Sequence, residues 1–352
     1  MVLKSIFLFF TAIVLVSCST AKLADQDHLS HRIDSLIQVK NPRVFNGVVL
    51  VSKNGKSMYE KAYGFSNRDQ QTKLRMDDEF SSMSIAKQIT ATLVMLQVEK
   101  GTIELQKPIG IYLKDLKYDW VNKVTVHHLL NNSSGIDAWE LKDQLLFEPG
   151  TQFKYSNIGY GTLGRILESA TGKTYEMLVT ELFAKCGMNN SFYPNSQNQL
   201  KLVNSYAMTK NGISVVNEFP YSQDLYPGSH LIINVRDLAK WNDMIHNGKI
   251  LKEESYQKMI QYSITDAHPL FGEKEIGYGY GLRINDKAGI YEIGHTGFSP
   301  PAGFTAVNLY YPEEKISVTV LENQATDDFD IAYYFEQAIR NMVVNSNSKI
   351  KK

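Results

Sequence analysis

The chain has 352 residues, of which 43% are hydrophobic and 21% are charged, so it can bury a large core as one big domain or two fused lobes. Lysine and arginine number 37 together, and so do aspartate and glutamate, which gives a formal net charge of +0. Because nucleic-acid binders usually carry a basic excess, this composition argues against nucleic acid as a partner.

Residues 1–18 have the pattern of an export signal. Lys4 precedes an apolar run over residues 6–16 that is too short to span a membrane comfortably. Leu15-Val16-Ser17-Cys18 resembles a bacterial lipobox, in which the cysteine is lipidated and becomes the new N-terminus; the alternative is an ordinary secretory peptide with an incidental cysteine. We expect an exported lipoprotein with a tether over 19–27, held by lipid on Cys18 to the periplasmic side of a membrane or to the cell surface. Ser19 favours the outer membrane.

Cysteine usage argues against a disulfide framework. The sequence has two cysteines, and lipidation of Cys18 leaves only Cys186 in the folded part of the chain. Cys186 follows an apolar helical run over 175–184, which predicts a buried small side chain rather than a nucleophile.

The predicted elements place strands towards both ends of the chain and helices between them. Asn54-Gly55 separates two apolar runs, which is a strong signal for a two-residue hairpin. In chain order, periodicity and turn residues predict a helix over 29–37, strands over 47–52 and 57–63, helices over 85–98, 157–170, 174–184 and 235–246, strands over 277–284, 290–293, 303–310 and 316–322, and a final helix over 329–344.

Strands from the two ends are expected to pair in one antiparallel sheet, because the first hairpin alone would be marginal. The expected fold class is α+β, with a sheet flanked by helices and an inserted all-helical lobe. We assign the sheet lobe to about 28–83 and 250–344, the helical lobe to about 84–249 and a polar tail to 345–352. Functional sites commonly lie at such lobe junctions.

Ser84 and Lys87 stand at the head of the apolar helix over 85–98. Positions i and i+3 share a helix face, so the lysine amine can reach the serine hydroxyl and help to remove its proton. Only this S-x-x-K pair opens a long buried-type helix; the same spacing recurs at Ser19/Lys22, Ser255/Lys258, Ser346/Lys349 and Ser348/Lys351.

Two further triplets follow in order along the chain. Tyr155-Ser156-Asn157 opens a predicted helix, and His295-Thr296-Gly297 ends a predicted strand. The order S-x-x-K, Y-S-N, H-T-G resembles the serine β-lactamase and DD-peptidase superfamily, on its class C-like branch, over about residues 28–343. The resemblance implies a β-lactamase/transpeptidase-like fold and a serine hydrolase that needs no cofactor or metal.

The resemblance also implies roles for these residues. Ser84 would be the acylated nucleophile, Lys87 and Tyr155 would transfer protons, and Asn157 would bind the substrate amide. His295, Thr296 and Gly297 would form a substrate-binding wall. The backbone N–H groups of Ser84 and Phe298 would stabilise the oxyanion. Which of Lys87 and Tyr155 is the base stays open at this point, since a coupled pair can titrate as a unit.

Two positions depart from the pattern. Many β-lactamases have lysine where this chain has His295, and a neutral imidazole holds a carboxylate less firmly than an ammonium does. The family often has histidine where this chain has Asn132, which puts one supporting hydrogen bond in doubt. Tyr221 and Tyr226 are expected either to line the pocket or to pack under a loop.

The sequence therefore predicts an acyl-enzyme hydrolase for amides or esters, with a small molecule or peptide as its partner. The expected substrate is a D-amino-acid peptide or a β-lactam-like compound, acted on by an enzyme of DD-carboxypeptidase, D-aminopeptidase or esterase type. Two alternatives are a promiscuous carboxylesterase of the same fold and a non-hydrolytic wall-binding or sensor domain. The second alternative has no need of Lys87 or Tyr155.

Overall fold

The computed structural model describes residues 28–287 and 289–348, so Cys18 and the predicted tether lie outside the described residues. The described part divides into two compact units, one of residues 28–45 with 334–348 and one of residues 46–333. In the first unit, residues 28–37 are helical, and α9 (Tyr334–Ser348) is the second helix. Arg43 donates to Glu336 at 2.9 Å in a buried ion pair of this unit.

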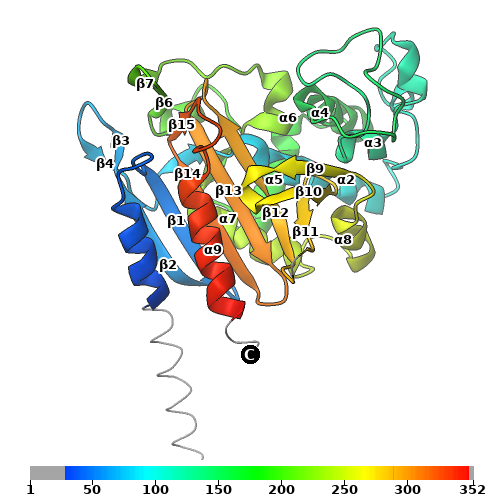
Figure 1. Ribbon diagram of the computed structural model, residues 1–352. Coiled ribbons are helices and arrows are strands. Elements are labelled where there is room, and N and C mark those ends of the chain that lie inside the picture. Colours follow the sequence, from blue (N-terminus) through cyan, green and yellow to red (C-terminus); the bar gives the residue numbers. More distant parts are fainter. Residues whose placement is uncertain (1–27, 288, 349–352) are drawn as a thin grey trace, which may run out of the picture. The chain divides into compact units, whose positions relative to one another are not determined.

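An antiparallel eight-stranded sheet is the framework of the second unit (Figure 1). The strands lie in the order β2-β1-β14-β13-β12-β11-β10-β9, so strands from both ends of this unit share one sheet, as predicted. Their bounds are β1 Gly47–Lys53, β2 Lys56–Tyr63, β9 Thr265–His268, β10 Glu273–Tyr278, β11 Arg283–Asn285, β12 Glu292–Ser299, β13 Phe304–Tyr311 and β14 Ile316–Glu322. The expected α+β fold class is confirmed.

The predicted hairpin is confirmed in the structure. Asn54 and Gly55 have φ angles of 52° and 71°, the two left-handed residues that a tight hairpin turn requires. The other neighbour of β1 is β14, with Val49 opposite Val320, and the described residues of both strands are almost all buried. Alternate side chains point to opposite sheet faces, so both faces of this central pair are covered.

Helices and smaller strands make up the rest. The helices of the second unit are α2 Ala86–Glu99, α3 Val126–Leu130, α4 Asn157–Thr171, α5 Tyr175–Cys186, α6 Tyr226–Ser229, α7 Val235–His246 and α8 Glu253–Ile260. Short 3-10 turns are η1 Met83–Ile85, η2 Ile109–Ile111, η3 Asp119–Asn122, η4 Asn198–Lys201, η5 Gln223–Leu225 and η6 Pro269–Phe271. The small sheets pair β3 (Phe65–Asn67) with β4 (Thr72–Lys73), β5 (Glu79–Ser81) with β8 (Ile232–Asn234), and β6 (Ser205–Thr209) with β7 (Gly212–Val216) and β15 (Gln324–Thr326).

Three predicted elements differ most from their bounds in the structure. The strand expected over 290–293 is β12, Glu292–Ser299, so it extends through the His295-Thr296-Gly297 triplet. The single strand expected over 277–284 is two strands, β10 and β11, with a turn between them at Gly281. Gly281 has φ of 66°, and a Cβ there would collide with the carbonyl of Lys87, so the turn packs against the first turn of α2. The last helix begins at Tyr334 rather than at 329, because the N–H of Asp330 bonds to the Asp328 carboxylate in a side-chain turn.

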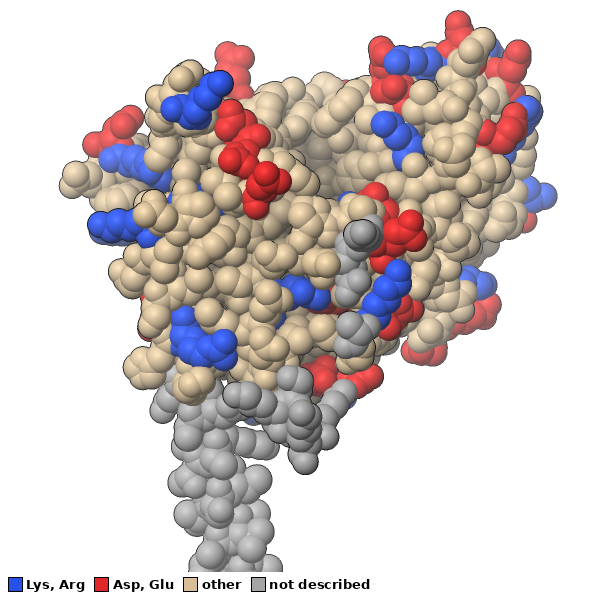
Figure 2. All heavy atoms as spheres, viewed as in Figure 1, with Lys and Arg blue, Asp and Glu red and all other residues tan. Residues whose placement is uncertain are grey.

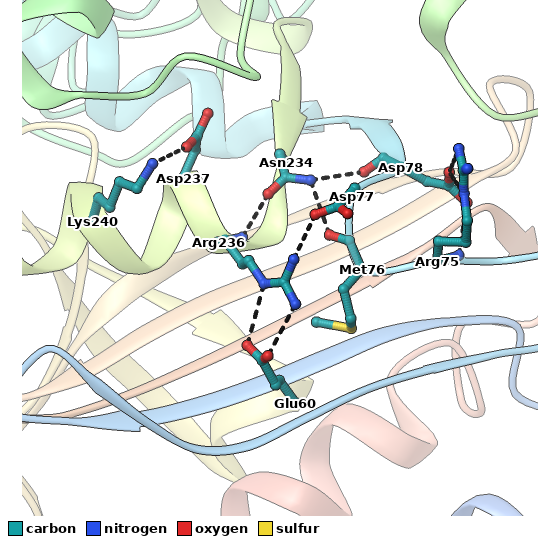
Figure 3. A network of polar contacts seen from close by, with 9 residues as sticks. All are labelled: Glu60, Arg75, Met76, Asp77, Asp78, Asn234, Arg236, Asp237 and Lys240. Atoms are coloured by element: carbon teal, nitrogen blue, oxygen red, sulfur yellow. Dashed lines mark hydrogen bonds and ion pairs between the residues drawn. The ribbon is translucent and has the colours of Figure 1, made fainter.

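A polar clamp fixes the short strand that leads to Ser84 (Figure 3). Arg236, in the first turn of α7, bonds to Glu60 on β2 through two nitrogens at 2.9 and 3.3 Å and to Asp77 at 2.5 Å. Asn234 caps the same helix through its Oδ1 and donates its Nδ2 to the carbonyls of Met76 and Asp78. The clamp ties β2, α7 and the segment entering β5 together.

One face of the molecule carries both signs of charge. On the face drawn in Figure 2, acidic and basic side chains occur in the same regions, in keeping with the balanced composition. Among the described residues, no helix has the length and apolar character needed to span a membrane.

Candidate active site

Ser84 lies in η1, between β5 and α2. The preceding residue, Met83, has φ of 46°, a left-handed conformation that residues other than glycine rarely adopt. Ser82 stabilises the turn, because its N–H donates to the Leu231 carbonyl and its Oγ accepts from the Leu231 N–H, each at 2.8 Å. Ser84 is partly exposed whereas Met83 and Ile85 are buried, so the turn presents one hydroxyl.

Lys87 is fully buried one helical turn after Ser84. Its Nζ donates to Asn157 Oδ1 at 2.7 Å and to the Gly228 carbonyl, and it lies 3.4 Å from Ser84 Oγ. Burial first, and then the charge of Arg283, lowers the pKa of Lys87 well below its usual value. A neutral amine has two N–H groups and one lone pair. Since the two carbonyl oxygens can only accept, a neutral Lys87 directs its lone pair at Ser84.

Tyr155 stands on the other side of Ser84. Its ring centre lies 4.4 Å from Lys87 Nζ and 6.1 Å from the ring centre of His295. Burial raises the pKa of Tyr155 far above its usual value, although the nearby Ser84 side chain and the charge of Arg283 oppose that shift. Tyr155 is therefore a neutral phenol near pH 7. The lowered pKa of Lys87 favours its neutral amine.

The segment bearing Tyr155 and Asn157 is held by its own side chains and by Asn132. Ser156 caps α4 by accepting from the Gly159 N–H at 2.9 Å, and it donates to the Asp137 carbonyl at 2.6 Å. Asn132 Oδ1 accepts from the Ser156 N–H at 3.1 Å. A supporting hydrogen bond was in doubt here, because Asn132 stands where the family often has a histidine. The asparagine makes such a bond.

The strand β12 forms the wall opposite Tyr155. Its ladder with β11 ends at Gly294, so residues 295–299 have no β11 partner. A Cβ on Gly297 would lie 2.5 Å from Met83 Cβ and 3.0 Å from Ser84 N, so this glycine permits the close approach of β12 to the nucleophile. Phe298, the expected second oxyanion donor, follows directly.

His295 has no free ring nitrogen. Its Nδ1 lies 2.6 Å from the Thr296 carbonyl, which can only accept, and its Nε2 lies 3.0 Å from the Tyr278 hydroxyl. The proton is therefore on Nδ1, and Tyr278 donates to Nε2. Burial, followed by the charges of Arg283 and Lys87, lowers the pKa of His295 well below its usual value. A neutral, fully bonded imidazole brings no charge to a substrate carboxylate.

Arg283 is the cation that the sequence analysis missed. It is 5% exposed at the start of β11, and its Nη1 donates to Asp266 at 2.6 Å. Its Cζ lies 5.9 Å from the ring centre of Tyr155 and 5.5 Å from that of Tyr278. Its Nε is buried and has no hydrogen-bond partner within the described part of the chain. A lone arginine between the apolar residues Leu282 and Ile284 was the available signal.

The comparisons with known proteins decide the family. A family model described as Beta-lactamase matches residues 33–340, most of the chain. The chain belongs to the Beta-lactamase family. Penicillin-binding protein 4* of Bacillus subtilis (strain 168) is 23% identical over 334 residues, covering 84% of this chain and 70% of that protein. Protein flp of Staphylococcus aureus (strain N315) is 23% identical over 319 residues, with 83% of this chain and 62% of that protein covered.

Solved structures agree on the Beta-lactamase family fold. The octameric penicillin-binding protein homologue from Pyrococcus abyssi superposes with a TM-score of 0.78 at 26% identity, covering 91% of this chain and 77% of that one. The D-amino acid amidase from Ochrobactrum anthropi SV3 gives a TM-score of 0.77 at 20% identity, covering 91% of this chain and 99% of that one. The β-lactamase/transpeptidase-like architecture expected from the motifs is thereby confirmed.

Other residues named in the sequence analysis also have definite positions. Tyr226 is buried, whereas Tyr221 is half-buried, donates or accepts at 2.6 Å with Ser299 Oγ and stacks on the exposed Trp139 at 5.6 Å. Cys186 is buried, which raises the pKa of its thiol to about 11 and leaves it unreactive near neutral pH. Over residues 28–287 and 289–348, no three His, Cys, Asp or Glu side chains are grouped to hold a metal ion.

Proposed function

We propose that this Beta-lactamase family member is an exported serine hydrolase that forms an acyl-enzyme at Ser84. The observation that carries the proposal is the arrangement of Lys87, whose Nζ is buried, bonded to two carbonyl oxygens and directed at Ser84 Oγ. A wall-binding or sensor domain would gain nothing from burying an amine next to a partly exposed serine.

In the proposed acylation, Ser84 Oγ attacks the substrate carbonyl carbon while its proton moves to Lys87 Nζ. Lys87 returns a proton to the Tyr155 hydroxyl as that hydroxyl protonates the leaving nitrogen or oxygen, so the C–N or C–O bond breaks and charge is balanced. Water then attacks the ester by the reverse relay. Lys87 is favoured as the base over Tyr155, because burial lowers the pKa of Lys87 and raises that of Tyr155.

The proposed oxyanion donors are the N–H groups of Ser84 and Phe298. Each such donor contributes about 3 kcal/mol of transition-state stabilisation. The close packing of Gly297 against the Ser84 backbone supports this assignment, because it brings the two N–H groups to the same place. Asn157 Oδ1 is occupied by Lys87, which leaves the Nδ2 of Asn157 to donate to a substrate amide carbonyl.

The proposed substrate carries a carboxylate, as a D-amino-acid peptide with a free C-terminus or a β-lactam does. The support is Arg283, whose buried Nε lacks a partner among the described residues, next to the neutral His295 and Thr296. A buried guanidinium that is not fully bonded favours a planar anion. The name of one relative, penicillin-binding protein, points to the same class, because a penicillin carries a carboxylate.

The test is covalent labelling of the purified protein by a fluorescent penicillin and by a fluorophosphonate. We expect both probes to label the wild type and neither to label Ser84→Ala. Ser255→Ala is the matched control, since Ser255 and Lys258 have the same spacing, and it should label as the wild type does. Folded protein that neither probe labels would refute the proposal. Labelling by the fluorophosphonate alone would contradict the carboxylate-bearing substrate and favour the carboxylesterase alternative.

A further inference from the structure

A second buried histidine, His268, lies next to Thr296. It is the last residue of β9, at the opposite end of the sheet order from β2, and is 8% exposed. Its Nε2 lies 2.9 Å from Thr296 Oγ1, and its Nδ1 lies 3.2 Å from the backbone nitrogen of Leu270. No step of the acylation described above uses this side chain.

The hydrogen bonds fix the position of its ring proton. The Leu270 N–H can only donate, so Nδ1 of His268 must carry a lone pair. Pro269 has no N–H, so His268 accepts from the first backbone donor of η6. In the neutral ring the proton is then on Nε2 and is donated to Thr296 Oγ1. Burial, followed by the charges of Arg283 and His295, lowers the pKa of His268 well below its usual value.

The consequence falls on the Thr296 hydroxyl. Because Thr296 Oγ1 accepts from His268, its own proton is available for donation. Across the described residues, that proton has no acceptor. Thr296 lies on the free edge of β12, and Arg283 is close enough to lower the pKa of both His268 and His295.

We infer that His268 is a positioning residue that makes the Thr296 hydroxyl a donor to the substrate carboxylate beside Arg283. The inference rests on the proposed function and deepens it. Selection for anionic substrates then depends on the His268 imidazole, which acts through Thr296 and does not contact the substrate. A Thr296 hydroxyl free to rotate would act as donor or acceptor and would favour an anion less.

Two substitutions of His268 separate its two hydrogen bonds. In His268→Asn the amide oxygen can replace Nδ1 and accept from Leu270, but the side chain is too short to reach Thr296. In His268→Gln the amide nitrogen can replace Nε2 and donate to Thr296 Oγ1. If His268 only caps η6, His268→Asn should behave like the wild type. If His268 positions Thr296, His268→Gln should behave like the wild type.

The readout is the ratio of two rate constants for labelling Ser84, one for a fluorescent penicillin, which carries a carboxylate, and one for a fluorophosphonate, which does not. A hydrogen bond to a charged group contributes about 1.5–3 kcal/mol, so this ratio should fall about tenfold or more in His268→Asn. It should stay near the wild-type ratio in His268→Gln. Thr296→Val should give the same fall, and adding His268→Asn to it should cause no further loss.

If the wild type is labelled and the ratio in His268→Asn is unchanged, the inference is overturned while the proposed function stays intact. Absence of labelling in the wild type would instead count against the proposed function. If the variants do not fold, 15N NMR of the histidine ring in the wild type still decides. A proton on Nε2 of His268 supports the inference, and a proton on Nδ1 overturns it.

Discussion

Replacing Arg283 by glutamine is expected to change both substrate choice and the pH dependence of acylation. The lost charge-assisted hydrogen bond corresponds to about 1.5–3 kcal/mol, so labelling by a carboxylate-bearing penicillin should slow about 10- to 150-fold. Lys87 Nζ and Arg283 Cζ lie 4.4 and 5.9 Å from the same Tyr155 ring centre, so the two charges are at most about 10 Å apart. At an effective dielectric constant near 20 they repel by about 1.6 kcal/mol or more.

The sign of the pH effect follows from that repulsion. Lys87 acts as a base only when neutral, so labelling slows as pH falls through the pKa of Lys87. Arg283 is the second cause, after burial, that lowers the pKa of Lys87. Without the guanidinium the pKa of Lys87 rises, and the acid limb of the labelling rate moves to higher pH.

The assay measures labelling rates for a fluorescent penicillin and a neutral fluorophosphonate across pH. For Arg283→Gln we expect a selective loss with penicillin and an upward shift of the acid limb with both probes. Arg283→Lys keeps the charge and should move the limb less. Arg165→Gln, which removes a surface ion pair with Asp115, is the control for loss of an arginine elsewhere. Equal losses with both probes and an unmoved acid limb would refute the assigned role.

Three further predictions concern Lys87, Gly281 and the lipobox cysteine. Lys87→Ala should slow the acylation of Ser84 by about a hundredfold or more, the usual range for a proton-transfer group, and an unchanged single-turnover rate would contradict this. Gly281→Ala should lower the thermal midpoint more than Gly101→Ala, because both have positive φ but only the Gly281 Cβ collides with the Lys87 carbonyl; equal losses would show that the collision is absent. Cys18→Ala should leave the protein unlipidated, and detergent partitioning like that of the wild type would count against the lipobox.

Local sequence patterns predicted most of the elements that hold the site. The bounds of the helix α7 match the prediction because Asn234 caps it and Gly248, at φ of 69°, follows its end. The hairpin after Gly47 follows from Asn54-Gly55. These signals lie within a few residues of the structure they specify, so a reading of the sequence alone can find them.

The missed features depend on contacts between distant segments. Arg283 becomes significant only because β11 lies next to β12 and beside Tyr155, which the spacing of the motifs does not reveal. The break at Gly281 is set by the carbonyl of Lys87, far away in sequence. The neutral, fully bonded state of His295 depends on Tyr278 across the sheet, so the residue type alone could not establish its charge.

The three-stranded sheet of β6, β7 and β15 was missed for the same reason. The segment over about 84–249 was predicted to be an all-helical lobe, and this is wrong in part: residues 205–216 form a hairpin whose first strand pairs in parallel with β15. Its second strand is mostly exposed and lacks the buried alternation that marks a core strand. The division into a sheet lobe, about 28–83 and 250–344, and a second lobe, about 84–249, stays a prediction.

The central claim is that acyl transfer passes through Ser84, and mass spectrometry of the protein quenched during reaction with a penicillin tests it most directly. The intact mass should rise by the mass of the whole β-lactam, and peptide mapping should locate the addition on the peptide that contains Ser84. The addition should be absent in Ser84→Ala. In the wild type it should be detected when the reaction is quenched before deacylation. An adduct on a different residue, or turnover of the penicillin in Ser84→Ala at the wild-type rate, would contradict the account.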